Sequence, residues 1–165
     1  PASKSRSAAE PAAAPVVGLR VGLLRLPGEG TGFKELFEKS FNVTNETFFQ
    51  TEIPDAFQFP LAAKLLAMSN TVDVIVAAHG AVKQEEKSEV MRGYQTVALT
   101  TNVPIIPADG VLDAAAMEKA ASAAVNMGEI RQQALMGTGP RSSNFFGIGA
   151  NKSAAPPGEK KKVYF

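Results

Sequence analysis

One residue of this chain, His79, has a side chain that titrates near neutral pH and is a candidate for proton transfer. It is the only histidine among the 165 residues, and it stands between the apolar run 72–78 and Gly80. The two interpretations are a general base and a histidine hydrogen-bonded in or near the core. Its place at the end of an apolar run favours the structural role, and His79 stays only a candidate catalytic residue.

The loop 27–32, with sequence Pro-Gly-Glu-Gly-Thr-Gly, is the one stretch that resembles a phosphate cradle. It lacks the Lys-Ser/Thr pair of a P-loop and the acidic residue at the distance typical of dinucleotide-binding folds, so we predict a turn. The chain contains no cysteine, which excludes disulfides, thiolate catalysis, zinc-cysteine sites and iron–sulfur clusters. We expect no metal and no bound cofactor.

Charge and composition restrict the other classes of function. The 17 basic and 16 acidic side chains are mostly interspersed and leave a net charge of +1, so no basic stripe for nucleic acid is present. A nucleic-acid or acidic neighbour is conceivable only near Lys160, Lys161 and Lys162. No apolar run approaches the roughly 20 residues that span a bilayer. With 45% hydrophobic residues, the chain can bury one substantial core.

Hydrophobic patterns predict strands that alternate with helices. We expect strands at 16–26, 47–53, 72–78 and 103–106, and helices at 32–42, 60–69, 84–102 and 114–136, the last interrupted near 126–128. Such alternation is typical of parallel βαβ units with helices on both faces of one sheet. The prediction is a three-layer α/β/α fold with a four-stranded, mainly parallel sheet. The expected buried helix faces are Phe33, Leu36, Phe37 and Phe41; Leu61, Leu65 and Met68; Val90, Met91, Tyr94, Val97 and Ala98; and Ala114, Met117, Ala120, Ala121 and Ala124.

Three segments make up the expected domain organisation. Residues 1–15 form a disordered or partner-bound arm, 16–136 form the α/β domain, and 137–165 form an extended tail. The tail contains Phe145, Phe146, Ile148, Tyr164 and Phe165, which a purely solvated segment would not require, so we expect a protein partner to hold it. The Ala-, Ser- and Arg-containing start suggests an organellar location, mitochondrial rather than plastid, and not secretion.

Several segments resemble the lumazine synthases. Residues 53–66 resemble the family pattern V-P-G-A-F-E-L-P-L-A-A-K-x-L, 74–83 resemble V-I-A-L-G-A-V-I-R, and 97–106 resemble V-A-L-E-T-G-V-P-V-I. The resemblance runs in unbroken order over about residues 20–125. It implies a flavodoxin-like fold and a homopentamer whose sites lie between subunits. It also implies an enzyme of riboflavin biosynthesis that joins a pyrimidinedione amine to a dihydroxybutanone phosphate.

The same resemblance implies a substrate pocket with altered chemistry. Leu26 stands where the family has an aromatic residue that stacks on the pyrimidine, and Gln58 replaces a carboxylate that contacts the substrate. Ala123 aligns near the phosphate-binding Arg, which removes a charge partner for an anionic substrate. The residues of this vestigial pocket are Leu26, Ala56, Phe57, Gln58, Gly80, Ala81 and Val82.

The clearest departure follows the third expected strand. Family enzymes have a loop G-[GE]-T-x-H-[FY]-[ED], whose Gly and Thr hold the phosphate and whose His transfers protons. Here Lys83 passes directly into Gln84 and a charged segment, so neither the Thr nor the His is present. His79 does not replace the missing histidine, because it lies four residues before Lys83.

These departures lead to three hypotheses. The first is a non-catalytic lumazine-synthase-like protein that serves as a structural subunit of a larger assembly, heteromeric or homopentameric. The second is an active lumazine synthase with a rearranged site, in which His79 or a neighbouring subunit supplies the proton-transfer group. The third is a flavin- or lumazine-binding module that keeps the pocket around Phe57 without turnover.

Overall fold

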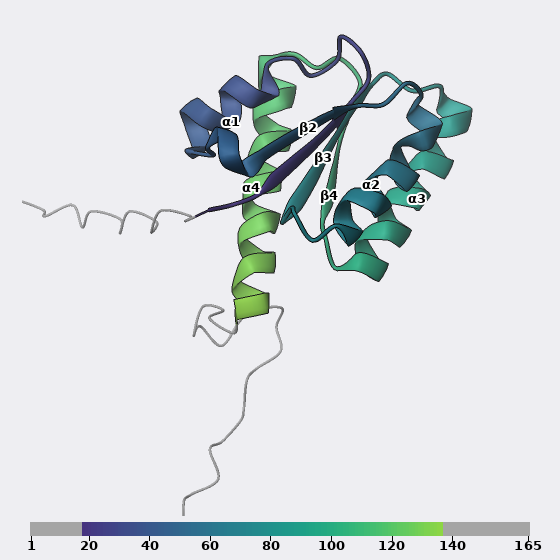
Figure 1. Cartoon of the computed structure of the whole chain (residues 1–165). Helices are drawn as coiled ribbons and strands as arrows, with labels where there is room; N and C mark the ends of the chain where they lie inside the picture. The colour runs from purple at the N-terminus through teal and green to yellow at the C-terminus, as the bar shows by residue number, and fades with distance from the viewer. Residues whose placement is uncertain (1–17, 137–165) are drawn as a thin grey trace, which may run out of the picture.

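A four-stranded parallel sheet lies at the centre of the protein (Figure 1). The computed structural model describes residues 18–136, so the predictions for 1–15 and 137–165 lie outside the described residues. The strands are β1 (Val21–Arg25), β2 (Phe48–Glu52), β3 (Val74–Gly80) and β4 (Ile105–Asp109). Their order across the sheet is β2-β1-β3-β4, and all three neighbouring pairs are parallel. The predicted α/β class and four-stranded sheet are confirmed.

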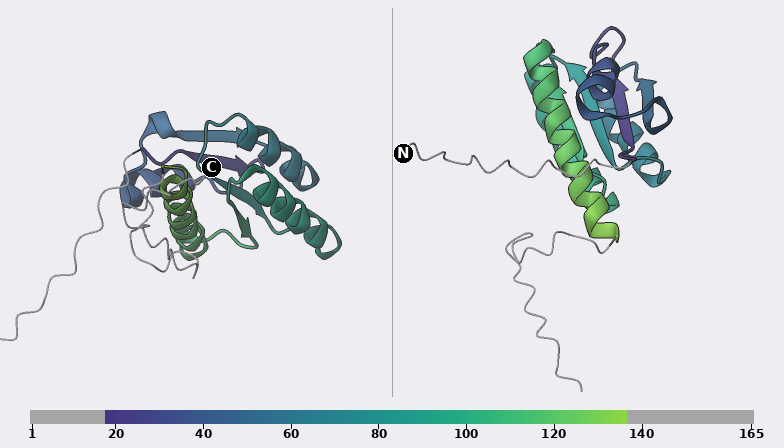
Figure 2. Two further views of the ribbon diagram at one scale, coloured as in Figure 1. Left: turned by 90° about the horizontal axis from the view of Figure 1, so that it is seen from below. Right: turned by 90° about the vertical axis from the view of Figure 1, so that its left-hand side faces the viewer.

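Four helices cover the sheet on two faces, three of them between strands and the fourth after β4 (Figure 2). They are α1 (Phe33–Phe41), α2 (Phe59–Met68), α3 (Gln84–Thr101) and α4 (Ala114–Met136), with short 3-10 helices η1 (Asn45–Thr47) and η2 (Ala56–Gln58). One apolar cluster joins α1 and α4 to the sheet, and a second joins α2 and α3 to its opposite face. The arrangement is therefore three-layered, as predicted.

The central strand β3 shows why this sheet is buried on both faces. Val74 and Val76 belong to the cluster beneath α1 and α4, whereas Ile75 and Ala77 belong to the cluster beneath α2 and α3. Side chains alternate between the two faces of a strand, so an unbroken apolar run supplies both cores at once. The same alternation places His79 on the side of α2 and α3, where it contacts Phe59 and Tyr94.

The aromatic face predicted for 32–42 is confirmed. Phe33 and Phe37 of α1 are fully buried, and their ring centroids lie 6.3 Å apart. Phe37 also packs against Phe41 at 5.9 Å and against Phe48 of β2 at 5.7 Å. This aromatic cluster fastens α1 to β1 and β2 and needs no ligand to explain it.

The face predicted for α2 is wrong. Leu61, Leu65 and Met68 are 61%, 61% and 66% exposed, and the buried residues are Phe59, Ala63 and Ala67. Small alanines let this helix lie close to the sheet, and the larger side chains point outward. A helix that is apolar on several faces does not by itself show which face the sheet will cover. With Phe57, the three exposed residues form what we call the α2 stripe: Phe57, Leu61, Leu65 and Met68.

Two element boundaries also differ from the predictions. The helix α4 is continuous through Gly128, because this glycine fits a close contact: a Cβ there would lie 2.5 Å from Leu19 Cδ1 and 3.2 Å from Val74 Cγ1. Local sequence indicates a break at Asn126–Gly128, and tertiary packing removes it. The first strand begins at Val21, later than the apolar run suggests, because Gly18 has a positive φ of 75° and the ladder starts beyond it.

A buried carboxylate joins the end of α4 to the start of the sheet. Asp73 is 2% exposed and accepts hydrogen bonds from Arg20, from Arg131 at 3.0 Å and from Gln132 at 2.9 Å. Burial raises the pKa of Asp73, but the hydrogen bonds from Arg20 and Gln132 and the charge of Arg20 outweigh it and lower the pKa below its usual value. Asp73 is therefore charged and fully partnered.

Candidate functional site

The candidate site lies at the carboxyl ends of the four parallel strands. In open α/β sheets, ligands bind outside these ends, at the point where the strand order reverses. In this sheet that point lies between β1 and β3, since β2 extends one way from β1 and β4 the other way from β3. The loops after β1 and β3 and the short helix η2 gather there, so the residues predicted from the resemblance share one edge of the sheet.

Charged residues of β1 and β2 form one side of this edge. Arg25 ends β1, donates a hydrogen bond to the Glu52 carboxylate at the end of β2, and donates a second at 3.4 Å to the backbone carbonyl of Glu29. Its side chain is only 13% exposed, and its Nε has no partner among the described residues. Arg25 thus holds the 27–32 loop in place and has little positive charge left to attract an anion.

Gly80 and Glu29 meet over the carboxyl end of β3. Gly80 has a φ of 61°, and a Cβ there would lie 2.8 Å from the Glu29 carboxyl carbon. The left-handed backbone favours glycine here, and a larger side chain would also require the Glu29 carboxylate to move. Gly80 also accepts a backbone hydrogen bond from Gly110 at 3.0 Å. A carboxylate therefore covers the place that a phosphate cradle would need, and it would repel an anionic ligand.

His79 lies beneath this edge, inside the core. It is 1% exposed, between the edge of Phe59 at 5.7 Å and the stacked ring of Tyr94 at 5.9 Å. A carbonyl can only accept a hydrogen bond, so the 3.1 Å contact to Gly80 places the proton of a neutral imidazole on Nδ1. The other ring nitrogen, Nε2, is buried and has no partner among the described residues.

The surroundings of His79 favour its neutral form. Burial lowers the pKa of His79 below its usual 6.5, and this outweighs the Gly80 hydrogen bond and the negative charge of Asp109, both of which raise it. Tyr94 is 3% exposed, and its pKa is raised, first by burial and then by Asp109. His79 and Tyr94 therefore form a buried, uncharged aromatic pair that solvent does not reach.

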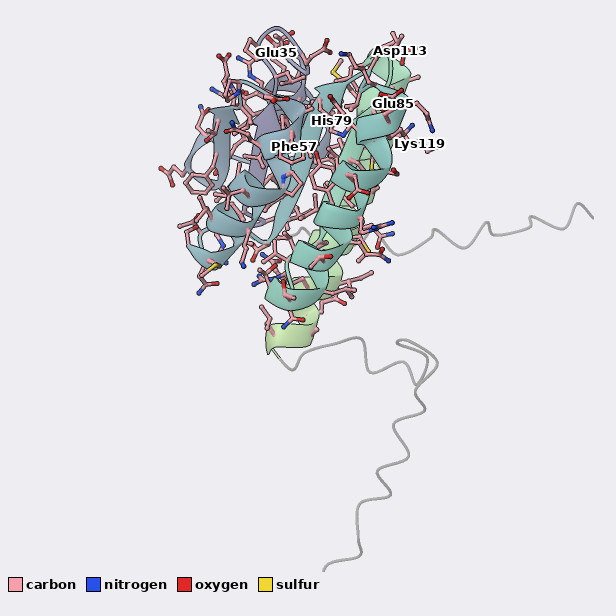
Figure 3. All side chains as sticks on the ribbon, turned by 90° about the vertical axis from the view of Figure 1, so that its right-hand side faces the viewer. Glu35, Phe57, His79, Glu85, Asp113 and Lys119 are labelled. Atoms are coloured by element: carbon pink, nitrogen blue, oxygen red, sulfur yellow. The ribbon has the colours of Figure 1, made fainter. Side chains whose placement is uncertain are left out.

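Phe57 and Gln58 occupy the third side of the edge, on η2. Asp55 caps this short helix by accepting a hydrogen bond from the Phe57 backbone N–H at 3.1 Å, which fixes the turn after β2. The Phe57 ring is 68% exposed, and Gln58 is exposed beside it. Figure 3 labels Phe57 and His79 in the upper part of the fold. These residues present an apolar ring and a neutral amide to solvent.

The remaining predicted residues lie at the same edge with mixed burial. Ala56 is the buried residue of η2, and Leu26 is partly buried against the core of α2 and α3. Ala81 is exposed and Val82 is half-buried, and α3 begins at Gln84, so only three residues connect β3 to this helix. The structure thus brings the seven pocket residues to one edge, with Phe57 and Gln58 open to solvent and His79 enclosed.

Sequence reasoning missed the charged residues of this edge. Arg25, Glu52 and Asp109 each end a strand, and Lys87 on α3 forms a salt bridge with Asp109. A usable signal was present, because Arg25 and Glu52 lie one residue before the ends of the expected strands 16–26 and 47–53, and Asp109 lies three residues after 103–106. The carboxyl ends of parallel strands meet at one edge. Their charges are paired with one another, Arg25 with Glu52 and Lys87 with Asp109.

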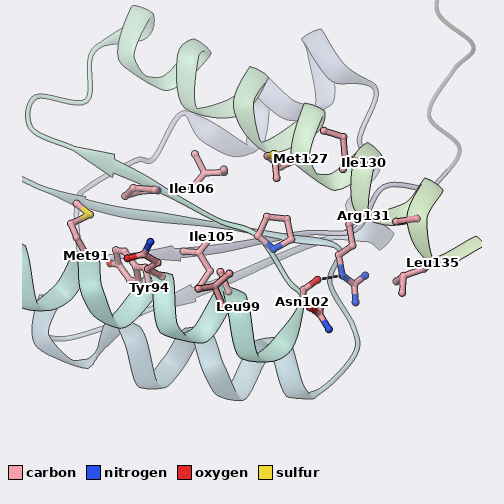
Figure 4. Close-up of a pocket in the computed structure, with 15 residues that line it drawn as sticks. Met91, Tyr94, Leu99, Asn102, Ile105, Ile106, Met127, Ile130, Arg131 and Leu135 are labelled. Atoms are coloured by element: carbon pink, nitrogen blue, oxygen red, sulfur yellow. Dashed lines mark hydrogen bonds between the residues drawn. The ribbon is translucent and has the colours of Figure 1, made fainter. Parts of the chain in front are cut away.

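An apolar hollow lies elsewhere, along the outer edge of β4 (Figure 4). We call it the β4 groove; it runs between α3 and α4 and has a volume of about 800 Å³. Arg131 closes one end by donating a 2.8 Å hydrogen bond to the carbonyl of Asn102. Its lining is mainly apolar: Met91, Tyr94, Gln95, Ala98, Leu99, Asn102, Pro104, Ile105, Ile106, Pro107, Met127, Ile130, Arg131, Ala134 and Leu135.

Two further searches cover residues 18–136 only. Within this range, no group of three or more His, Asp or Glu side chains is arranged to hold a metal ion. Within the same range, no helix has the length and apolar character needed to cross a membrane.

Comparison with known proteins gives a local similarity. No family model matches the chain. The chain is 36% identical over 61 residues to 6,7-dimethyl-8-ribityllumazine synthase of Thermococcus gammatolerans, a match that covers 33% of this chain and 40% of the relative. The matched segment is thus similar to part of a lumazine synthase and covers well under half of each protein. The four-stranded parallel sheet is consistent with this similarity.

Proposed function

We propose that this protein is a non-catalytic, lumazine-synthase-like structural subunit of a larger assembly. The observation that carries the proposal is the enclosure of His79, which is 1% exposed and stacked on Tyr94. A general base must lie within hydrogen-bond reach of the proton it removes. His79 is the only histidine of the chain, and a ligand at the carboxyl edge could reach it only if the edge opened.

The charges of the edge support the same proposal. Glu29 lies over Gly80, and the cations Arg25 and Lys87 are each paired with a carboxylate. A phosphorylated substrate needs charged donors that are not already engaged, and the pairing of Arg25 and Lys87 with carboxylates weakens the attraction of this edge for an anion. Arg25 Nε and the exposed Lys83 are donors that remain open at this edge among the described residues.

An exposed apolar surface, the α2 stripe, supports the structural role. All four residues of the stripe are more than 60% exposed, and they follow one another at intervals of three and four residues along η2 and α2. Large exposed apolar side chains gathered in this way are typical of a protein interface. The stripe lies apart from the lining of the β4 groove, so it can contact a neighbour whatever occupies that groove.

The decisive experiment is a turnover assay on the purified full chain. The chain is incubated with the pyrimidinedione amine and dihydroxybutanone phosphate, and the fluorescence of 6,7-dimethyl-8-ribityllumazine is followed against a blank without protein. The synthase of Thermococcus gammatolerans serves as the positive control. We expect a rate equal to the blank, and product formation above it would refute the proposal. Native mass spectrometry of the particle from its source then distinguishes a homopentamer from a heteromeric complex.

A second candidate function is ligand binding without turnover, favoured by the exposed ring of Phe57 at the carboxyl edge. A flavin or lumazine could stack on this ring. Titration of riboflavin with the full chain, followed by quenching of flavin fluorescence, tests the idea, with Phe57→Ala as the matched variant. Quenching that saturates and is lost in the variant would support binding; equal curves for both proteins would exclude it.

A further inference from the structure

We propose that the β4 groove is the docking site for a segment of this chain's own C-terminal region, residues 145–148, with sequence Phe-Phe-Gly-Ile. The groove has about 800 Å³ of mainly apolar lining, within the range of sites that bury a compact ligand. Its exposed apolar side chains include Leu99 at 75%, Leu135 at 65% and Met127 at 37%. An apolar hollow of this size on a water-exposed surface needs an apolar occupant.

The point where the described chain ends identifies that occupant. Leu135 lines the groove, and Met136 ends both α4 and the described residues. Phe145 follows nine residues later, and nine extended residues span roughly 30 Å. The five-residue strand β4 is only about 16 Å long, so the segment can reach every part of the groove.

The composition of the segment matches the groove. The stretch 142–151 has no charged residue, and its two phenylalanines and one isoleucine are the first large apolar side chains after Met136. The groove likewise has one charged lining residue, Arg131, which is already held by Asn102 and Asp73. Attachment to the same chain also raises the local concentration of the segment to the millimolar range.

The segment docks through its side chains and does not extend the sheet. The Pro104 carbonyl accepts a hydrogen bond from the backbone N–H of Ile75 in β3. The backbone groups of Ile105 and Pro107, at alternate positions, therefore point away from β3 toward the open edge of the sheet. Pro107 has no N–H to donate, which leaves the outer edge of β4 poorly suited to strand addition.

The handedness of the connections leads to the same conclusion. The connection from β3 to β4 runs through α3 and moves outward across the sheet. A further parallel strand beyond β4 would continue in the same outward direction, but through α4. However, α4 lies on the opposite face from α3, so the connection would have the opposite hand. Parallel crossovers are right-handed in about 98% of cases. This rule disfavours a fifth parallel strand reached through α4, and Pro107 disfavours strand addition in either direction, so docking is proposed to occur through side chains.

The absence of cysteine allows a direct cross-linking test. One full-length variant carries Gln95→Cys, at the margin of the groove, with Asn144→Cys next to the segment. The control variant carries Lys64→Cys, an exposed position on α2, with the same Asn144→Cys. Both are oxidised mildly at about 1 µM, far below the effective concentration within one chain, and disulfides are identified by peptide mass spectrometry.

We expect the intramolecular disulfide of the groove variant to form at least about tenfold faster than that of the control. The reason is that docking raises the effective concentration of the cysteine at position 144 beside the one at position 95, whereas the cysteine at position 64 meets only the undocked segment. Equal rates would overturn the proposal. Disulfides that join two chains at this dilution would also overturn it, because they would show that the groove takes the segment of a second copy.

Native methionines give a second, independent readout. In a full-length variant with Phe145, Phe146 and Ile148 all changed to Ser, peroxide should oxidise Met127 in the groove several times faster than in the wild type. Met68 on the α2 stripe, which is 66% exposed, is the internal control and should not change. An unchanged rate at Met127 would contradict docking, whatever the result of the turnover assay.

Discussion

His79 shows how a residue suited to catalysis becomes part of a core. Its imidazole is stacked on Tyr94, its Nδ1 is bonded to the Gly80 carbonyl, and no solvent reaches the ring. A charged imidazolium at this place would lose its hydration without gaining a close carboxylate partner. A histidine two residues further along, at the exposed position of Ala81 beyond the end of β3, would be open to solvent.

The first prediction concerns the protonation of His79. Because burial is the dominant cause, its pKa lies below 6.5 in the folded protein. The chain has one histidine, so a single imidazole resonance in the proton NMR spectrum reports this pKa without assignment. We expect a titration midpoint below 6.5, and a midpoint at or above 6.5 would show that the ring is solvated or paired with an anion.

The second prediction is the effect of pH on stability. Between the lowered folded pKa and 6.5, the unfolded chain binds a proton at His79 that the folded chain does not. The free energy of unfolding therefore decreases as the pH falls through 6.5 and stops decreasing below the folded pKa. In urea titrations, His79→Gln should remove this slope between pH 7.5 and the folded pKa; an identical slope in both proteins would assign it to other groups.

The third prediction concerns the hydroxyl of Tyr94. It is buried and has no partner among the described residues, and an unpaired buried polar group costs about 1–3 kcal/mol. Tyr94→Phe should leave the free energy of unfolding unchanged or raise it by about 1 kcal/mol, as measured by urea denaturation. A loss of about 1 kcal/mol or more would reveal a hydrogen bond through a buried water.

At the scale of elements, α2 and α4 show what local sequence does not determine. Both are helices where hydrophobic patterns predict helices, yet α2 turns Leu61 and Leu65 outward and α4 passes through Gly128 without a break. In α2 the small Ala63 and Ala67 permit a close approach to the sheet. In α4 the space of a missing Cβ is filled by Leu19. Each outcome depends on the partner surface, which lies far away in sequence.

The fourth prediction tests the contact between α4 and the sheet. Asp73→Ala would leave Arg20 and Arg131 beside a buried site without their carboxylate, and breaking such a buried pair costs about 3–5 kcal/mol. Because Arg20 is partly exposed, we expect a loss of about 3 kcal/mol in the free energy of unfolding. The control Glu118→Ala, at an exposed position on α4, should change it by less than about 0.5 kcal/mol. Equal effects would show that Asp73 is dispensable.

At the scale of the whole molecule, two apolar surfaces contrast with the carboxyl edge. At the edge Arg25 is paired with Glu52, Lys87 is paired with Asp109, and His79 is enclosed. The α2 stripe and the β4 groove instead present large apolar side chains that are exposed among the described residues. The proposed structural role assigns the α2 stripe to a neighbouring protein.

The fifth prediction follows from that distribution. Leu65→Glu places a charge in the middle of the α2 stripe and should abolish association with partner subunits, because an interface core excludes unpaired charge. The thermal midpoint of the isolated chain should change little, since Leu65 is 61% exposed. Lys64→Glu, one position away and also exposed, is the control. Recovery of the same particle mass with both variants, by native mass spectrometry, would exclude the stripe as an interface.

The sequence by itself determined the order and type of the main elements and the parallel sheet. These depend on the period of the apolar pattern, which is a local property, and on the right-handed crossover rule. Only the tertiary structure decided which face of α2 is covered, that α4 is unbroken, that Glu29 lies over Gly80 and that His79 is enclosed. These depend on close packing between segments far apart in the chain, which a one-dimensional pattern does not contain.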